Sequence, residues 1–125
     1  MSPAIWLWAS RGLAALTVAV VAVLFITAGE LVQSNQLEDV HGTAAIALHV
    51  VSGALAISML GLARQRRSGW WAAGLATALF GYSFAQAYLG EGPTLAIHIP
   101  GALLAAAAPI ALCCWLFTRP ETRNR

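Results

Sequence analysis

Charged side chains are scarce in this chain of 125 residues, and lysine is absent altogether. Asp, Glu, Lys and Arg together make up 10% of the residues, whereas hydrophobic residues make up 59%. Because soluble domains carry about 25% charged residues, this balance excludes an ordinary soluble domain and predicts a membrane protein. The chain also lacks a hydrophilic segment long enough to fold as a second domain. A functional site must therefore lie within the apolar segments or at their ends.

Four stretches of the sequence contain no Asp, Glu, Lys or Arg, namely residues 12–29, 42–63, 68–90 and 92–118. Each is near or above the length of about 20 residues that crosses a bilayer core. We therefore predict an all-α, integral membrane, up-down-up-down four-helix bundle. It forms a single domain, residues 1–125, with helices over approximately residues 12–32, 36–63, 68–90 and 93–118. Faint similarity between the two halves, such as Leu24-Phe25 and Leu79-Phe80, suggests two tandem helical hairpins.

The basic residues, all of them arginine, precede the first stretch and follow the second and the fourth. The two loops at the opposite end carry acidic residues and no basic ones. The positive-inside rule then places both termini in the cytoplasm of a bacterial cell, with the helices in its cytoplasmic (inner) membrane. All five tryptophans fall at the same predicted inner interface, where an aromatic belt is expected. The net charge of +2 thus reflects membrane topology, and we expect no nucleic-acid partner.

Three histidines, His41, His49 and His98, lie within or beside these apolar stretches. Imidazole is costly in hydrocarbon unless it is paired or coordinated, so these residues are the first indication of function. The second and fourth helices of such a bundle run in the same direction and lie diagonally opposite. With neighbouring axes about 8 to 10 Å apart, two imidazoles on the diagonal helices have room for a metal between them. The pattern favours a b-type haem with two axial histidines.

Depth in the membrane favours His41 as the partner of His98. Counted outward from the inner arginines at 1.5 Å per residue, His41 and His98 stand about 34 and 31 Å away, and His49 only about 22 Å. Asn35 and Glu38 are typical of a capping box at the start of the second helix, which places His41 in an early turn. Gly92-Pro93 opens the fourth helix and does the same for His98.

The local sequence favours His49 instead, because Ala47-Leu48-His49-Val50 resembles Ala96-Ile97-His98-Ile99. We give depth the greater weight. Three roles stay open for His49: an iron ligand in place of His41, a residue that lines the same cavity, or a hydrogen-bonded histidine of the core.

Several polar residues fall near the outer end of the third predicted helix, at about the level of the histidines: Tyr82, Ser83, Gln86 and Tyr88. They are candidates for hydrogen bonds to haem propionates or to a quinone headgroup. Cys113 and Cys114 are neighbours near the cytoplasmic end of the fourth helix, where their side chains point about 100° apart. We expect no disulfide between them, because that compartment is reducing.

The segment Glu38-Asp39-Val40-His41, together with His98 early in the fourth helix, resembles one four-helix half of haem A synthase. A similar arrangement is found in small bacterial four-helix membrane b-type haem proteins. The resemblance covers the whole chain in layout and these residues in motif. It implies a haem held between His41 and His98, with Glu38 in the place of a catalytic glutamate. Gly42 stands where that family has an arginine, and its paired extracellular cysteines are absent.

These observations predict a haem b protein that transfers single electrons, with quinone or a respiratory membrane complex as its partner. Glu38 is placed to take a proton if a quinol is the donor. Two alternatives stay open. One is a zinc or copper site in which His41, His49 or His98 joins Glu38 or Glu91. The other is a non-catalytic accessory subunit of a membrane complex, and the sequence also leaves open whether two copies form a homodimer.

Overall fold

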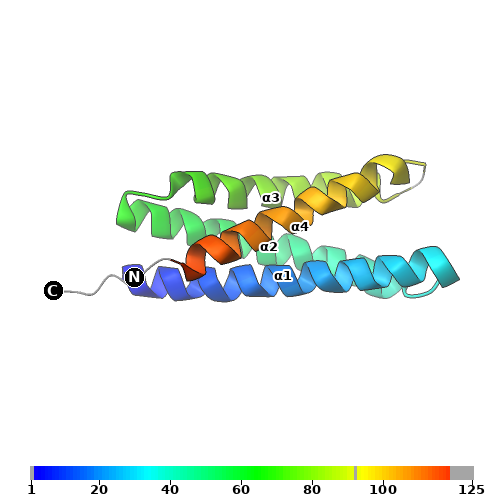
Figure 1. The fold of residues 1–125 in the computed structure, drawn as a ribbon, viewed down its shortest axis with the longest axis horizontal. Helices are drawn as coiled ribbons and strands as arrows, with labels where there is room; N and C mark the ends of the chain where they lie inside the picture. The colour runs from blue at the N-terminus through cyan, green and yellow to red at the C-terminus, as the bar shows by residue number, and fades with distance from the viewer. Residues whose placement is uncertain (1, 92, 119–125) are drawn as a thin grey trace.

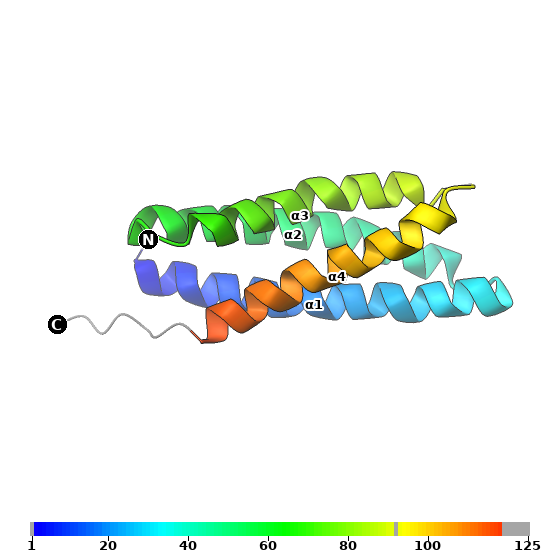
Figure 2. The same ribbon diagram turned by 45° about the horizontal axis from the view of Figure 1, so that its top comes forward.

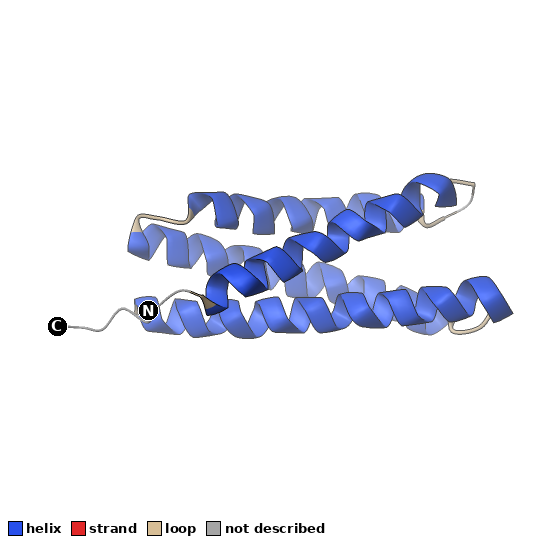
Figure 3. Cartoon of the chain, in the orientation of Figure 1, coloured by secondary structure: helices blue, strands red, loops and turns tan. Residues whose placement is uncertain are grey.

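The computed structural model describes residues 2–91 and 93–118, and in these ranges its regular elements are four α-helices. They are α1 (Pro3–Ser34), α2 (Glu38–Arg66), α3 (Trp70–Leu89) and α4 (Leu95–Phe117). Figure 1 shows them as an elongated bundle in which successive helices run in opposite directions. The connections between them are short loops (Figure 3). The predicted all-α four-helix bundle is therefore confirmed.

Each helix packs against two of the others. α1 contacts α2 and α4, and α3 contacts the same two helices. Over the described residues α2 and α4 do not pack against each other, so they are diagonally opposite, as expected for an up-down-up-down bundle. Figures 1 and 2 both show α4 running obliquely, from beside the end of α3 toward the first half of α1. The helices that carry the three histidines thus occupy one diagonal of the bundle.

Three of the helices, α1, α2 and α4, are long and apolar enough to cross a membrane by length and composition. α3 does not reach this level of hydropathy, although it has 20 residues. The reason is its composition, because two tryptophans, two tyrosines, Ser83 and Gln86 interrupt its apolar residues. The expectation of four spanning helices is therefore met by three, and α3 joins them through its packing against α2 and α4.

α1 begins at Pro3, nine residues before the start expected near residue 12. Its first turn has the features of a helix start, because Pro3 opens the helix and the Ser2 hydroxyl accepts a hydrogen bond from the backbone N–H of Ile5. Arg11 therefore does not flank the helix. It lies within α1 with 8% of its surface exposed, and its Nε donates to the backbone oxygen of Leu116 at 3.2 Å.

The capping box expected from Asn35 and Glu38 does not form. Asn35 instead ends α1 in the left-handed conformation, with φ of 55° and its N–H bonded to the oxygen of Leu31. The residue that caps α2 is Leu37, also left-handed, and no side chain bonds to that helix end. Asparagine is one of the few residues that tolerates this conformation, so here it terminates a helix rather than starting one.

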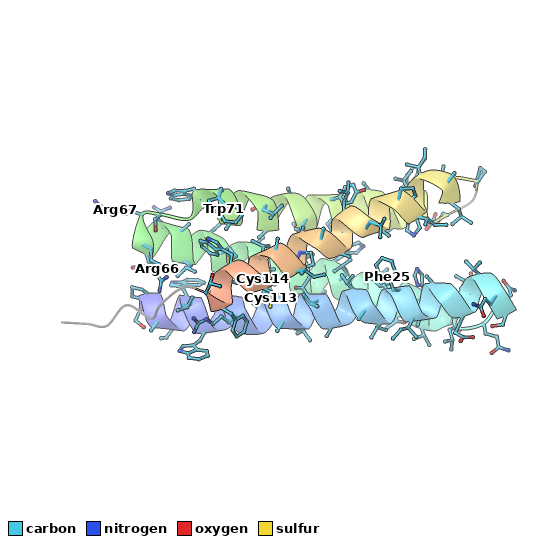
Figure 4. All side chains as sticks on the ribbon, viewed as in Figure 1. Phe25, Arg66, Arg67, Trp71, Cys113 and Cys114 are labelled. Atoms are coloured by element: carbon cyan, nitrogen blue, oxygen red, sulfur yellow. The ribbon has the colours of Figure 1, made fainter. Side chains whose placement is uncertain are left out.

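Several of the arginines and tryptophans assigned to the inner interface lie together at one end of the bundle, whereas the three arginines after α4, at 119, 123 and 125, lie outside the described residues. Figure 4 shows Arg66, Arg67 and Trp71 at the end where α2 meets α3. Trp71 also contacts Trp115 of α4 edge to face, with ring centroids 5.3 Å apart. Cys113 and Cys114, which directly precede Trp115 in α4, are free thiols, the first half-buried and the second exposed. This end has the aromatic and basic character of an interfacial belt.

The contact between α1 and α2 is close because small residues face each other there. The hydroxyls of Ser10 and Ser58 are 2.8 Å apart and buried. Gly61 lies directly under the Trp6 ring, and a Cβ at this position would lie 2.7 Å from the ring carbons. Small residues that let helix backbones approach are the usual means of packing in membranes.

The glycine under Trp6 makes a direct test of this packing. We expect Gly61→Ala to lower the free energy of unfolding in detergent by about 1 to 3 kcal/mol, because the methyl group displaces a ring that the core holds in place. Thermal unfolding followed by circular dichroism measures the change. Gly12→Ala is the matched control, since a Cβ on Gly12 meets nothing within 4 Å. Equal stability of the two variants would contradict the close contact.

Candidate functional site

His41 is the fourth residue of α2, in its first turn, and its ring is held by α1. Its Nδ1 lies 2.9 Å from the hydroxyl oxygen of Thr27, which is 3% exposed. The same hydroxyl donates to the backbone oxygen of Val23 at 2.9 Å, so its single proton is already used. In this arrangement His41 donates from Nδ1–H. That tautomer leaves Nε2 with a lone pair, as in a metal-binding histidine.

His49 is also half-buried, and its ring contacts two side chains of α3. Its Nδ1 lies 2.8 Å from the hydroxyl of Ser83, which donates to the oxygen of Phe80. The imidazole stacks on Phe84 with ring centroids 4.2 Å apart and an interplanar angle of 12°. Its hydrogen bond has the same form as that of His41, so the stacking on Phe84 is what distinguishes His49. Of the three roles left open by the sequence, this stacking favours a hydrogen-bonded histidine of the core.

His98 is the fourth residue of α4, the position that His41 has in α2. Its ring packs against the end of α3, where a Cβ on Gly90 would lie 3.3 Å from Cε1. Its Nδ1 is buried and has no hydrogen-bond partner among the described residues. His41 and His98 thus lie in the first turns of their helices, at the same end of the bundle, with His41 against α1 and His98 against the end of α3.

Gln86 of α3 occupies the contact between α3 and α4. It is 6% exposed, and its Nε2 donates to the hydroxyl of Tyr82 at 2.8 Å. Its Oε1 is buried without a hydrogen-bond partner in the part of the chain that the structure describes. Gly101 of α4 faces this pair, and a Cβ there would collide with Gln86 and Tyr82. Gly101 therefore lets α4 come into close contact with these two polar side chains.

The other polar candidates lie outside this contact. Glu38 is exposed as the first residue of α2, Glu91 is exposed in the loop before α4, and Tyr88 is 77% exposed. Among residues 2–91 and 93–118, no three His, Cys, Asp or Glu side chains come together in a way that could hold a metal ion. The zinc or copper alternative therefore gains no support from the arrangement of these side chains.

Two shallow apolar grooves lie on the sides of the bundle, away from the histidine rings. The larger, of about 410 Å³, runs along the α1–α2 contact and is lined mainly by valine and alanine. The second, of about 310 Å³, lies between α1 and α4. Neither groove is lined by a histidine.

The pairing of Thr27 with His41 is not among the contacts predicted from the sequence. A signal was present, because the two residues lie seven positions on either side of Ser34, at the turn between α1 and α2. In an antiparallel hairpin, positions that mirror each other across the turn come to the same height. The same reflection relates Gln86 and His98, which lie six positions on either side of residue 92. Gly90 and Gly101 carried no such signal, since glycines occur throughout these helices.

The hydrogen bond between Thr27 and His41 can be isolated by a pair of variants. We expect Thr27→Val to free the imidazole, which appears as a changed ¹⁵N signal of His41 Nδ1 and a loss of about 1 kcal/mol in stability. Thr17→Val is the matched control, because Thr17 is also buried and also donates to the backbone four residues earlier. An unchanged His41 signal in Thr27→Val would contradict the assigned bond.

No known family model, curated protein or solved structure matches this chain. Two findings about the chain itself bear on function. The first is a pair of histidines at equivalent positions of two diagonal helices. The second is a buried polar contact between α3 and α4.

Proposed function

We propose that the protein is a membrane-embedded b-type haem protein that transfers single electrons, with Nε2 of His41 and Nε2 of His98 as the axial ligands. The observation that carries the proposal is the placement of the two imidazoles. Each belongs to the fourth residue of its helix, on helices that lie diagonally in the bundle. A layout of this kind is expected of two ligands that bind one iron from opposite sides.

The residues present fit such a group in two respects. The Thr27 hydroxyl accepts from Nδ1–H of His41 and presents the neutral Nε2, which is the form of histidine that binds iron. The buried Nδ1 of His98 has no partner in the described chain, which is unusual for a core histidine held only by packing. A bound haem supplies a one-electron couple whose potential depends on its axial ligands, on hydrogen bonds to them and on burial.

The side chains around the pair have their own parts in this proposal. Thr27 orients His41 and makes it a stronger ligand by accepting a hydrogen bond from its Nδ1–H. Glu38 lies three residues before His41, exposed at the rim, where it can accept a proton released during electron transfer. The apolar helices exclude water from the site. With the arginine-rich end in the cytoplasm, the histidines lie near the outer face of a bacterial inner membrane.

The resemblance to half of haem A synthase belongs to the same proposal. It supports haem between the second and fourth helices and assigns Glu38 a place beside the ligand. The exposed position of Glu38 suits an exchange of protons with water at the outer surface. We infer that electron transfer, rather than modification of the haem, is the function, because the buried polar side chains at this end donate or accept hydrogen bonds and include no carboxylate.

The test is an optical spectrum of the protein purified from membranes in detergent. We expect a Soret band and a reduced-minus-oxidised difference spectrum of the bis-histidine b type, present on purification or after reconstitution with haem. Elemental analysis of the same sample separates iron from zinc and copper. A helical, monodisperse protein that takes up no haem would overturn the proposal, and stoichiometric zinc or copper would replace it.

A further inference from the structure

Among residues 2–91 and 93–118, the α3–α4 contact contains two buried side-chain atoms without a hydrogen-bond partner. One is Oε1 of Gln86 on α3, and the other is Nδ1 of His98 on α4. They belong to one local group, because Gln86 presses on Gly101, which is three residues after His98. His98 in turn packs on Gly90, which is four residues after Gln86. We name these four residues, Gln86, Gly90, His98 and Gly101, the α3–α4 seam.

An unsatisfied polar atom is costlier in a membrane than in a soluble protein, since lipid cannot hydrogen-bond to it. A pair of such atoms in one seam is therefore a strong indication of a polar ligand. Their chemistry is complementary, because Oε1 of an amide only accepts, whereas Nδ1 of a histidine in its Nδ1–H tautomer donates. A single hydroxyl group can satisfy both atoms, since its proton goes to Gln86 and its oxygen accepts from His98.

We propose that the α3–α4 seam binds the headgroup of a membrane quinol, with one hydroxyl bonded between Oε1 of Gln86 and Nδ1 of His98. The choice of a quinol rests on the position of the seam and on the polarity of its atoms. The seam lies at the end of an apolar bundle, where a lipid-soluble molecule with a polar ring arrives from within the bilayer. A quinone offers only acceptors, which leaves Oε1 of Gln86 without a donor. The seam therefore prefers the reduced form.

Tyr82 sharpens this selectivity. Its hydroxyl accepts from Nε2 of Gln86 and so orients the amide with Oε1 away from Tyr82. The oxidised ring meets a single donor in the seam, whereas the reduced ring meets a donor and an acceptor. As the source of electrons for haem the quinol rests on the proposed function, but its binding does not, because the two contact atoms belong to the protein itself.

The experiment is a titration followed by NMR on protein labelled with ¹⁵N in glutamine and histidine, held in detergent micelles. The probe is decylubiquinol under reducing conditions. We expect saturable shifts of the Gln86 side-chain amide and of the His98 ring, while Gln65, exposed at the opposite end of α2, stays unchanged. Decylubiquinone should bind about tenfold more weakly, the effect of one lost hydrogen bond. Equal or tighter binding of the quinone, or no saturable shift with either form, overturns the proposal and leaves an ordered water as the partner.

Two variants test the contact atoms. Gln86→Met removes the acceptor at similar volume, and Gly101→Ala displaces the amide without removing a polar group. In both we expect the His98 shift to need about tenfold more decylubiquinol, whereas Gln65→Met behaves as the natural protein. Helicity is checked in each case, and the comparison of quinol with quinone on the natural chain requires no variant. Undiminished binding by both folded variants overturns the proposal.

The outcome separates this site from the proposed function. A protein that lacks a Soret band yet shows the selective quinol shifts keeps the site and loses the haem. A protein with the haem spectrum but without those shifts keeps the haem and loses the site.

Discussion

His98→Ala is expected to remove the haem spectrum of the purified protein, and His41→Ala is expected to do the same. Each variant deletes one of the two axial nitrogens, and its partner on the opposite diagonal helix cannot bind the second face of the iron. We expect the haem-to-protein ratio to fall more than about tenfold. A tenfold change in affinity corresponds to about 1.4 kcal/mol, and the free energy of one iron–nitrogen bond is larger than this. Pyridine haemochrome assay and the Soret absorbance measure this ratio.

His49→Ala is the control for this pair, because it removes the same side chain from the same bundle. Its Nδ1 is hydrogen-bonded to Ser83 and its ring is stacked on Phe84, so the haem content should stay close to that of the natural chain. Added imidazole should restore part of the spectrum in His41→Ala and His98→Ala by replacing the missing ring. If His49→Ala loses haem while His41→Ala keeps it, the axial ligand on α2 is His49.

Arg11→Met is expected to lower the free energy of unfolding by about 1.5 to 3 kcal/mol, the range for a hydrogen bond to a charged group. Arg11 is buried in α1, and its Nε donates to the oxygen of Leu116 near the end of α4. Its guanidinium carbon also lies 4.9 Å from the Trp8 ring and 5.5 Å from the Phe117 ring. Methionine keeps the aliphatic volume but leaves that carbonyl without this donor, so the end of α4 loosens from α1.

Arg64→Met provides the comparison, since Arg64 is an exposed arginine at the same end of the bundle. Its removal should change stability by no more than about 0.5 kcal/mol, as for other surface substitutions. Chemical denaturation in detergent, followed by circular dichroism, gives both values. Hydrogen exchange adds a local measure, because only Arg11→Met should speed exchange at the end of α4. Matching losses in the two variants would mean that total charge, and not the bond to Leu116, stabilises this end.

The fold could be predicted from the sequence to the extent that charge determines it. The runs without charged residues gave four helices in the right order. The depth count placed His41 and His98 at matching positions, and both residues are the fourth of their helices. Charge also misled the prediction at one place. The charge-free run predicts Arg11 as the flank of the first helix, whereas in the structure the arginine lies inside α1, bonded to a carbonyl oxygen and next to two aromatic rings.

The contacts of the site were harder to predict because they depend on how neighbouring helices are rotated. Thr27 looks like an ordinary apolar-helix threonine until α1 is set against α2, and only then does its hydroxyl meet His41. Gln86 could be placed at the right height, but its burial depends on Gly101 allowing α4 to come close. Periodicity gives the height of a residue in such a bundle, whereas its partners follow from the packing of side chains.

The modest hydropathy of α3 has a consequence for how the chain enters the bilayer. Its tryptophans, tyrosines, Ser83 and Gln86 make α3 a weaker signal for lateral release into the lipid than the three helices that pass the hydropathy criterion for a membrane span. Its neighbour α4 is strongly apolar and follows after a short connection. Entry as a preformed helical pair, with α4 supplying the driving force, is then the favourable route during biogenesis.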